Sequence, residues 1–402
     1  MASLANVTPG ASYPGLIKTI DNSAVTSESQ LSDGCGNALS IYVSPDYLKT
    51  TQLIGGCSNT VTNGCYATVL NGCLNCATGC FSSIIGSSNS CSLGAFSHVI
   101  GGSNNCIISS HSGIFNSYLS GITRFEQAGY NNGHTIIGGR GNCIGDACCL
   151  GVIVGGLNNC ITIGRRGMVL GGTSNTSAGD GATLIASGSS LTNASSSLIF
   201  ASANSYMGCF AQNVTIGAGN CHCIPNNISY GSIIGGGFST ITANNSGIFQ
   251  SSLSTVSGAY SVSVGGKCNV TCGCSSSVLG GSNNTVASVF SSVGGGQSNC
   301  VSAPHSSIGG GCLNRAVGSF SSVVGGVNNC AIGAYSTIFG GQLNSATCAN
   351  SAVFGCGITS SMSCAFHTNR IVVTQLPSSS AGLPSGAMWY DPAAGNVVKY
   401  VP

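Results

Sequence analysis

The sequence predicts an all-β protein built as a parallel β-solenoid, on three observations. A Gly-Gly pair returns every 15 residues from Gly265-Gly266 to Gly340-Gly341. An Asn follows each first glycine by four residues, and a β-branched residue precedes most of them by two. Short runs of Ser, Thr and Val, typical of strands, fill the stretch before each pair. Fifteen residues are too few for a helix pair and suit one coil of a solenoid.

Each part of the repeat has a predicted task. The Gly-Gly pair is expected to end a strand and to let the chain turn where a Cβ atom would clash. The Asn is expected at a corner, because Asn tolerates left-handed backbone, and stacked asparagines are expected to bond along the axis. The predicted turn ladder consists of Gly265, Gly280, Gly295, Gly310, Gly325 and Gly340 with Asn269, Asn284, Asn299, Asn314, Asn329 and Asn344.

The repeat extends well beyond its regular part. The first-glycine position can be followed back to residue 55, which gives about twenty coils between Gln52 and Cys356. We therefore expect a shaft over residues 52–358. Residues 1–51 break the repeat and form an expected N-terminal cap or attachment segment, with strands at 15–20 and 38–43. Residues 359–402 are expected to form a strand that leaves the solenoid, a linker and a β-hairpin cap around 391–395.

The composition is poor in charge and rich in apolar residues. Ten basic and eight acidic residues among 402 give a net charge of +2, and no basic patch exists beyond Arg165-Arg166, so nucleic acid is not an expected partner. Because 42% of the residues are apolar, a single chain would be hard to keep soluble. We therefore expect apolar surface to be buried between copies of the chain in a homotrimer or filament. We expect neither a secretory signal nor an apolar run long enough for a transmembrane helix, and therefore no insertion into a membrane.

The 24 cysteines follow the repeat as well. Many stand five residues after the first-glycine position, where other coils carry Thr or Ser, so they are interpreted as a stacked column of small side chains. Which cysteines are oxidised stays open. The spacing of Cys73, Cys76 and Cys80 hints at a metal, but Cys76 belongs to the column, and no metal or cofactor is expected. The column comprises Cys76, Cys91, Cys106, Cys143, Cys160, Cys300 and Cys330.

One insertion gathers side chains that are scarce elsewhere. Residues 121–133 lengthen a coil by seven residues, and insertions in repeat proteins map to one face, often the binding face. The candidate receptor-binding residues are Arg124, Phe125, Glu126 and Tyr130, and the alternative is a tolerated surface loop. A periodic aromatic column, by contrast, is interpreted as core or subunit interface rather than a ligand platform; it comprises Tyr260, Phe290, Phe320 and Tyr335.

The motif G-x-[FY]-S-[ST]-[VI]-x-G-G-x-x-N, at Gly318 to Asn329 and Gly333 to Asn344, resembles the repeats of trimeric autotransporter adhesin heads and of related phage tail-fibre proteins. Residues 376–390 and 15–22 look like the ends of viral fibre proteins. The resemblance implies a homotrimer of β-solenoids that projects from a surface and adheres. Those autotransporters have a signal peptide and a membrane anchor; the expected lack of both favours a virion or extracellular fibre, with baseplate or capsid proteins and a host glycan or receptor as partners.

Two other functions remain as alternatives. A polysaccharide-degrading tailspike would need two carboxylates about 5–10 Å apart. The expected shaft contains only Glu126, Asp146 and Asp180, so no catalytic residue is assigned. A subunit of a self-assembling extracellular filament fits the low charge and the cysteines equally well, and the two ends of the chain would distinguish it from a finite fibre.

Overall fold

The computed structural model describes residues 57–61, 66–123, 133–372, 375–394 and 397–402, with the backbone alone at 146–148, and the backbone of four strands before residue 51. All regular structure in these residues is β-structure. Within this part of the chain, no helix is long and apolar enough to span a membrane. Contacts divide the chain into two compact units, Met1–Phe290 and Ser291–Pro402.

The first unit begins with a small antiparallel sheet. Its strands are β1 (Lys18–Thr19), β2 (Ser29–Ser32), β3 (Ala38–Val43) and β4 (Leu48–Thr50), and they pair in this order. Strand β3 coincides with the strand predicted at 38–43.

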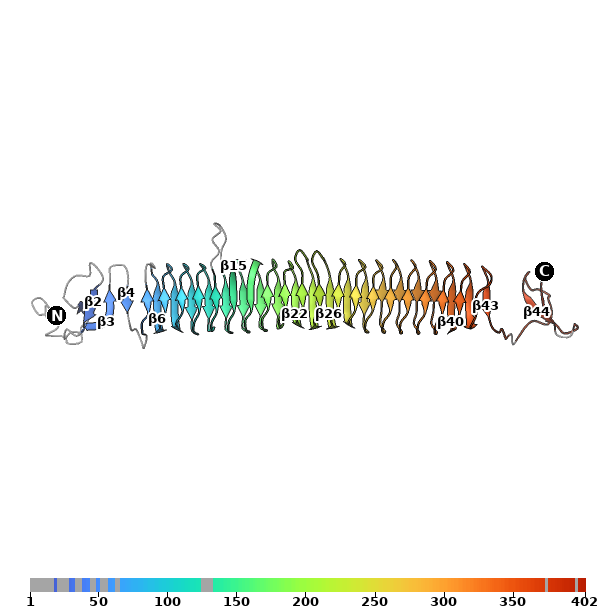
Figure 1. Ribbon diagram of the computed structural model, residues 1–402, viewed down its shortest axis with the longest axis horizontal. Helices are drawn as coiled ribbons and strands as arrows, with labels where there is room; N and C mark the ends of the chain where they lie inside the picture. The colour runs from blue at the N-terminus through green and yellow to red at the C-terminus, as the bar shows by residue number, and fades with distance from the viewer. Residues whose placement is uncertain are drawn as a thin grey trace, which may run out of the picture. The chain divides into compact units, whose positions relative to one another are not determined.

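Two long parallel sheets make up the rest of the first unit, and every coil contributes one strand to each (Figure 1). The first sheet contains β6 (Thr68–Cys73), β8 (Ser83–Ser88), β10 (His98–Ile100), β12 (Gly113–Phe115), β14 (Thr135–Ile137), β16 (Val152–Val154), β18 (Met168–Leu170), β20 (Thr183–Ile185), β22 (Leu198–Ala203), β24 (Thr215–Asn220), β26 (Ser232–Gly237), β28 (Gly247–Ser252), β30 (Val262–Val264) and β32 (Ser277–Val278).

The second sheet is built from shorter strands that follow the corner of each coil. It contains β5 (Thr60–Val61), β7 (Cys76–Ala77), β9 (Cys91–Ser92), β11 (Cys106–Ile107), β13 (Gly121–Ile122), β15 (Cys143–Cys149), β17 (Cys160–Arg165), β19 (Thr176–Ser177), β21 (Leu191–Thr192), β23 (Tyr206–Met207), β25 (Cys223–Ile224), β27 (Thr240–Ile241), β29 (Thr255–Val256), β31 (Val270–Thr271) and β33 (Thr285–Val286).

The second unit repeats this arrangement. Its first-sheet strands are β34 (Ser292–Val293), β36 (Ser307–Ile308), β38 (Ser322–Val323), β40 (Thr337–Gln342), β42 (Ala352–Cys356) and β43 (Phe366–Thr368). Its second-sheet strands are β35 (Cys300–Val301), β37 (Arg315–Ala316), β39 (Cys330–Ala331) and β41 (Ser345–Ala346). The hairpin of β44 (Met388–Asp391) and β45 (Val397–Tyr400) follows, where the sequence predicts one.

The predicted parallel β-solenoid of about twenty coils is thereby confirmed for the described residues. Equivalent positions pair in register: Val99 lies beside Ile114, and Ile114 beside Ile136 although 22 residues separate them. One point of the prediction is wrong: β43 adds a last rung to the first sheet instead of leaving the solenoid. Each coil also has a second sheet strand that the sequence analysis did not identify.

The core consists of two inward-facing columns, one from each sheet. The middle residues of the first-sheet strands and the second residues of the second-sheet strands are buried, as Ile84, Ile114, Ile107 and Ile144 show. Fully burying one such side chain contributes about 1.5–3 kcal/mol. The coil is closed by corners at which residues adopt left-handed backbone, such as Tyr260 (φ 58°), Gly265 (φ 68°) and Cys268 (φ 57°).

Candidate functional site: corner ladders, cysteine column and apolar stripe

The candidate receptor-binding residues Arg124, Phe125, Glu126 and Tyr130 lie outside the described residues. The solenoid keeps its register on both sides of them, since Gly113 pairs with Thr135 and Gly121 with Cys143. The candidate sites among the described residues are therefore the repeated columns of the solenoid.

The asparagine column is a buried ladder of side-chain to backbone hydrogen bonds. Asn329 donates its backbone N–H to Asn314 Oδ1 (3.0 Å), and its own Oδ1 accepts the N–H of Asn344 (3.1 Å). Its Nδ2 donates to the carbonyls of Gly325 (3.1 Å) and Gly341 (3.0 Å). Amide-to-backbone bonds therefore link each coil to both neighbours in this part of the column, while the expected bond between stacked amides occurs between Asn175 Nδ2 and Asn159 Oδ1 (3.1 Å).

The left-handed residue at this corner is not the asparagine. It is the residue before it, such as Asn328 (φ 55°) or Leu343 (φ 58°). The glycine requirement also moves by one position: a Cβ atom at the second glycine Gly311 (φ 90°) would lie 2.1 Å from the carbonyl oxygen of Gly326, whereas one at the first glycine Gly310 meets nothing within 4 Å. Glycine is thus required at the second position, whereas at the first position the requirement varies: Gly310 has free space around it, and Gly265 adopts a positive φ (68°).

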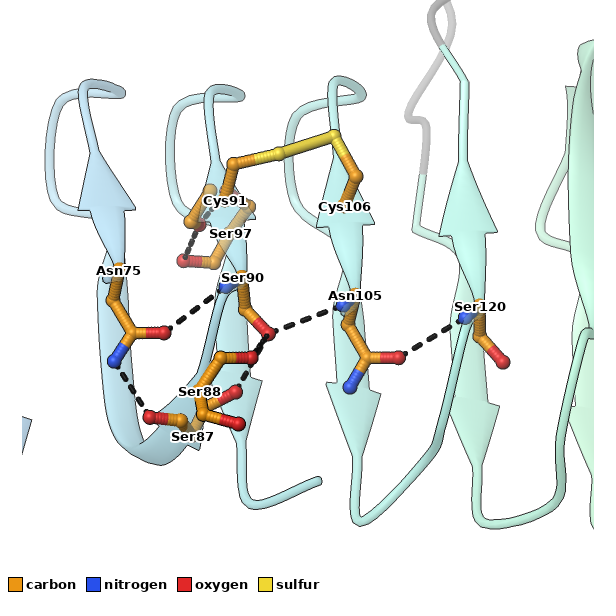
Figure 2. The surroundings of a disulfide bond; sticks show 10 residues. Asn75, Ser87, Ser88, Ser90, Cys91, Ser97, Asn105, Cys106 and Ser120 are labelled. Carbon is orange, nitrogen blue, oxygen red and sulfur yellow. Dashed lines mark hydrogen bonds between the residues drawn. A yellow bond between two sulfur atoms is a disulfide. The ribbon is translucent and has the colours of Figure 1, made fainter. Parts of the chain in front are cut away.

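A second type of corner replaces Gly and Asn by two serines. Ser87 donates to Ser90 Oγ (2.7 Å), and Ser117 bonds to Ser120 (2.6 Å) in the same way. A Cβ atom at Gly102 would lie 1.9 Å from the carbonyl oxygen of Ser117 and 2.9 Å from Asn105 Nδ2, so this Asn corner has no room for a side chain at the glycine position. A serine also occurs with a glycine, in the corner of Gly236 and Ser239. Figure 2 shows both types alternating through Asn75, Ser90, Asn105 and Ser120.

Two histidines replace small polar residues in these buried columns. Burial lowers the pKa of His134 to about 4, and its Nδ1 accepts the backbone N–H of Gly151 (3.1 Å). Burial also lowers the pKa of His222, partly offset by the carbonyl group of Ala218. Neither ring nitrogen of His222 has a hydrogen-bond partner of ordinary geometry among the described residues. Both histidines are therefore held neutral inside the solenoid.

The cysteine column lies on the outer face of the second sheet. Each described member opens a second-sheet strand and is followed by an inward residue. Cys76 pairs in register with Cys91, and Cys91 with Cys106, to which it is joined by a disulfide (Figure 2). Arg315 separates Cys300 from Cys330. The described residues contain no group of three or more His, Cys, Asp or Glu side chains placed to hold a metal ion.

The aromatic side chains form exposed stacks at a left-handed corner. In the first unit, ring centroids are 5.0 Å apart for Tyr66–Phe81, 4.9 Å for Phe81–Phe96 and 5.0 Å for Phe96–His111. In the second unit, Phe320 stacks on Tyr335 at 4.9 Å. These residues, like Tyr260 and Phe290, are exposed in the chain, so they do not form core, and the other part of the interpretation, a subunit interface, stays a prediction. Stacking occupies the ring faces and leaves the edges to solvent.

The outer face of the first sheet carries what we call the apolar stripe. It is formed by the outward residue that follows each buried middle residue, and the row beside it carries mostly small or hydroxyl side chains. Neither row contains a charged residue. In the first unit, the members are Leu70, Ile85, Ile100, Phe115, Ile137, Val154, Leu170, Ile185, Phe200, Ile234, Phe249, Val264 and Leu279.

The stripe is uneven in height, and glycine takes its position at Gly217 in the first unit and at Gly294 and Gly309 in the second. Ile100 is 39% exposed, Ile137 45% and Leu279 57%. The ring of Phe200 lies over Gly217, where a Cβ atom would come within 2.1 Å of it. In the second unit, Val324, Phe339 and Phe354 continue the same type of position and are exposed. Such an extended apolar row exceeds the scattered exposed hydrophobic residues of ordinary soluble proteins.

Several charged side chains lie at the corners, whereas Arg315 lies in the cysteine column. Asp180 accepts a hydrogen bond from the backbone N–H of Arg165, and Arg166 (φ 57°) is exposed at the aromatic-stack corner. The guanidinium carbon of Arg140 lies 5.2 Å from the ring centre of Tyr118. In the C-terminal hairpin, Lys399 Nζ lies 2.5 Å from Asp391 Oδ2, and this contact lowers the pKa of Asp391.

Comparisons with known proteins add little to this geometry. No protein-family model matches the chain. No curated protein matches it either. Among solved structures, UDP-N-acetylglucosamine O-acyltransferase from Moraxella catarrhalis RH4 is 18% identical, and the match covers 51% of this chain and 65% of that one, with a TM-score of 0.10. A TM-score this low carries no argument about fold or activity.

Proposed function

We propose that this chain is a non-enzymatic structural fibre and adhesion protein, a viral or phage fibre that projects from a particle as a homotrimer and contacts a host surface. The observation that supports the proposal most is the apolar stripe. It presents a long, uncharged apolar row in register with the coils, and burying it against other copies would remove that row from water.

The repeat resemblance supports the same function, because trimeric adhesin heads and phage tail fibres share its motif. Hydrogen bonds from the backbone and from the asparagine side chains join each coil to the next. Such bonds oppose local unfolding, as the shaft of a fibre requires. Host contact is assigned to the insertion at 121–133, with Arg124, Phe125, Glu126 and Tyr130 as receptor-binding candidates.

Catalysis is not part of the proposal. Of the three carboxylates in the shaft, Asp180 is the one whose side chain the structure describes, and it is exposed and engaged by the backbone of Arg165. A polysaccharide-degrading tailspike remains the remote alternative. Incubation with a panel of host polysaccharides is expected to release no reducing ends, and sustained turnover would replace the fibre proposal by the tailspike.

Electron microscopy of the purified chain tests the fibre directly. Discrete particles whose end views show three-fold symmetry are expected. Long continuous fibrils would favour the second candidate, a subunit of a self-assembling extracellular filament, whose joints would be residues 1–51 and 359–402. Single unsymmetrical particles would overturn both. Particles that show the expected symmetry would then be tested for binding to host glycans, with a deletion of the seven residues 124–130, which restores the 15-residue spacing, as the matched variant.

A further inference from the structure

Three cysteines in adjacent coils share one disulfide. Cys76 opens β7, Cys91 opens β9 and Cys106 opens β11, and all three are half-buried on the outer face of the second sheet. Cys91 and Cys106 are disulfide-bonded with their Cα atoms 4.6 Å apart (Figure 2), and Cys76 carries a free thiol. Because Cys76 pairs in register with Cys91, the two possible partners of Cys91 lie on its two sides.

We propose that Cys76, Cys91 and Cys106 form a thiol–disulfide exchange site, in which one disulfide moves between the pairs Cys91–Cys106 and Cys76–Cys91. Exchange proceeds by attack of a thiolate on one sulfur of a disulfide, and the other sulfur leaves. Equivalent side chains of an in-register parallel sheet form a row along the sheet axis. The row places Cys76 on the side of Cys91 opposite Cys106, which is the side from which an in-line attack must come.

The step is balanced without any added oxidant or reductant. The Cys76 thiol gives its proton to solvent, and the thiolate donates an electron pair to Sγ of Cys91. The Cys76–Cys91 bond forms as the Cys91–Cys106 bond breaks, and Cys106 leaves as a thiolate that takes a proton from solvent. The reverse step restores the first state.

Within the cysteine column, the run of adjacent cysteines ends with these three residues. Thr60 lies beside Cys76 on one side of the run, and Gly121 lies beside Cys106 on the other. Elsewhere the column lacks such a run: Cys143 and Cys160 form a pair bounded by Gly121 and Thr176. Cys300 and Cys330 are two rungs apart, roughly 9–10 Å at the usual strand spacing, which is beyond the reach of a disulfide.

Differential alkylation of the full-length chain tests the proposal. The native protein is incubated at pH 8, free thiols are blocked with N-ethylmaleimide, and the remaining cysteines are reduced, labelled with iodoacetamide and located by mass spectrometry. Cys76 and Cys106 are each expected to react with N-ethylmaleimide in part, within about tenfold of each other, because their surroundings in the sheet are alike. Cys91 is expected to be protected. Full protection of Cys106 with complete labelling of Cys76 would overturn the proposal, as would labelling of all three.

Serine variants separate exchange from a fixed bond. Cys106→Ser is expected to show a Cys76–Cys91 disulfide, and Cys76→Ser to show Cys106 fully protected. Cys91→Ser is expected to leave Cys76 and Cys106 unbonded, since two rungs separate them. Small polar residues occupy this position in other coils, such as Thr60 and Thr176, so these variants are expected to fold. A Cys106→Ser chain whose Cys76 and Cys91 both stay reduced under the same conditions would contradict the exchange.

Discussion

At the scale of single residues, the buried asparagines hold one coil to the next. The side-chain amide of Asn329 makes three hydrogen bonds, to the carbonyls of Gly325 and Gly341 and to the N–H of Asn344, and its backbone N–H donates to Asn314 Oδ1 in the preceding coil, all at 3.0–3.1 Å. Its neighbour Asn328 points to solvent at a left-handed position. Two adjacent residues of the same type therefore have opposite roles.

Asn329→Ala is expected to destabilise the surrounding coils by about 2–4 kcal/mol, because the buried N–H of Asn344 loses its acceptor and the carbonyl of Gly325 its amide donor. Amide hydrogen exchange across residues 325–345 measures the loss. Asn328→Gly keeps the left-handed corner and is the matched control, expected to change the exchange little. Equal effects of the two substitutions would show that the ladder contributes nothing of its own.

The buried histidine His134 predicts acid sensitivity. Its pKa of about 4 lies below the ordinary value of 6.5, so the unfolded chain binds more protons between these two pH values. The contribution of the neutral His134 to the free energy of unfolding is fully present above pH 6.5 and is lost as the pH falls towards 4. The total change is at most about 3 kcal/mol.

His134→Ser places the residue found at Ser82, Ser97 and Ser112 in the same column, and is expected to reduce the acid-induced fall in melting temperature between pH 7 and pH 4.5. His98→Ser, at an exposed position, is the control and is expected to leave the fall unchanged. If the His134→Ser chain melts with the same pH dependence as the natural chain, then the burial of this imidazole does not govern its acid response.

At the scale of elements, the two corner types make a paired prediction. In the Ser87–Ser90 corner, Ser90→Asn alone would bring an amide against the Cβ atom of Ser87, as the 2.9 Å approach of Asn105 Nδ2 at Gly102 indicates. Ser87→Gly alone would remove the hydroxyl that donates to Ser90. The double variant recreates the Gly–Asn corner of the neighbouring coils.

Each single substitution in this corner is expected to destabilise the chain, and the double variant to recover most of the loss, with a coupling of about 1–3 kcal/mol. Thermal unfolding of the four chains of the double-mutant cycle measures the coupling. Additive effects within about 0.5 kcal/mol would mean that the pairing of the two positions along the chain has no energetic basis.

The period of the sequence predicted the first sheet, the number of coils and the hairpin, because glycine, asparagine and β-branched residues repeat at fixed offsets. It did not predict the second sheet, whose strands such as Cys300–Val301 are mostly two residues long and too short to show alternation. The Ser–Ser corners were missed because serine is common throughout the chain. The aromatic column was identified from its period, but its position at left-handed corners was not, because Phe and Tyr seldom adopt positive φ.

At the scale of the molecule, the apolar stripe links the fold to the proposed fibre. Each member, such as Ile137 or Phe249, follows a buried residue of a first-sheet strand and so must point outward. A row that is uncharged and in register over successive coils is a surface that a second copy can match coil by coil. Its members escaped notice in the sequence because apolar residues next to a buried Val or Ile look like core.

The mass of the chain in solution, measured by light scattering, tests this account most directly. The natural chain is expected at three times its 39.7 kDa, and Ile137→Lys, which places a charge in the stripe, is expected to shift it towards the single-chain mass. Thr173→Lys, at an exposed position outside the stripe, is the control and is expected to keep the threefold mass. A natural chain of 39.7 kDa that stays soluble, or an Ile137→Lys chain with an undiminished mass, would contradict association through the stripe.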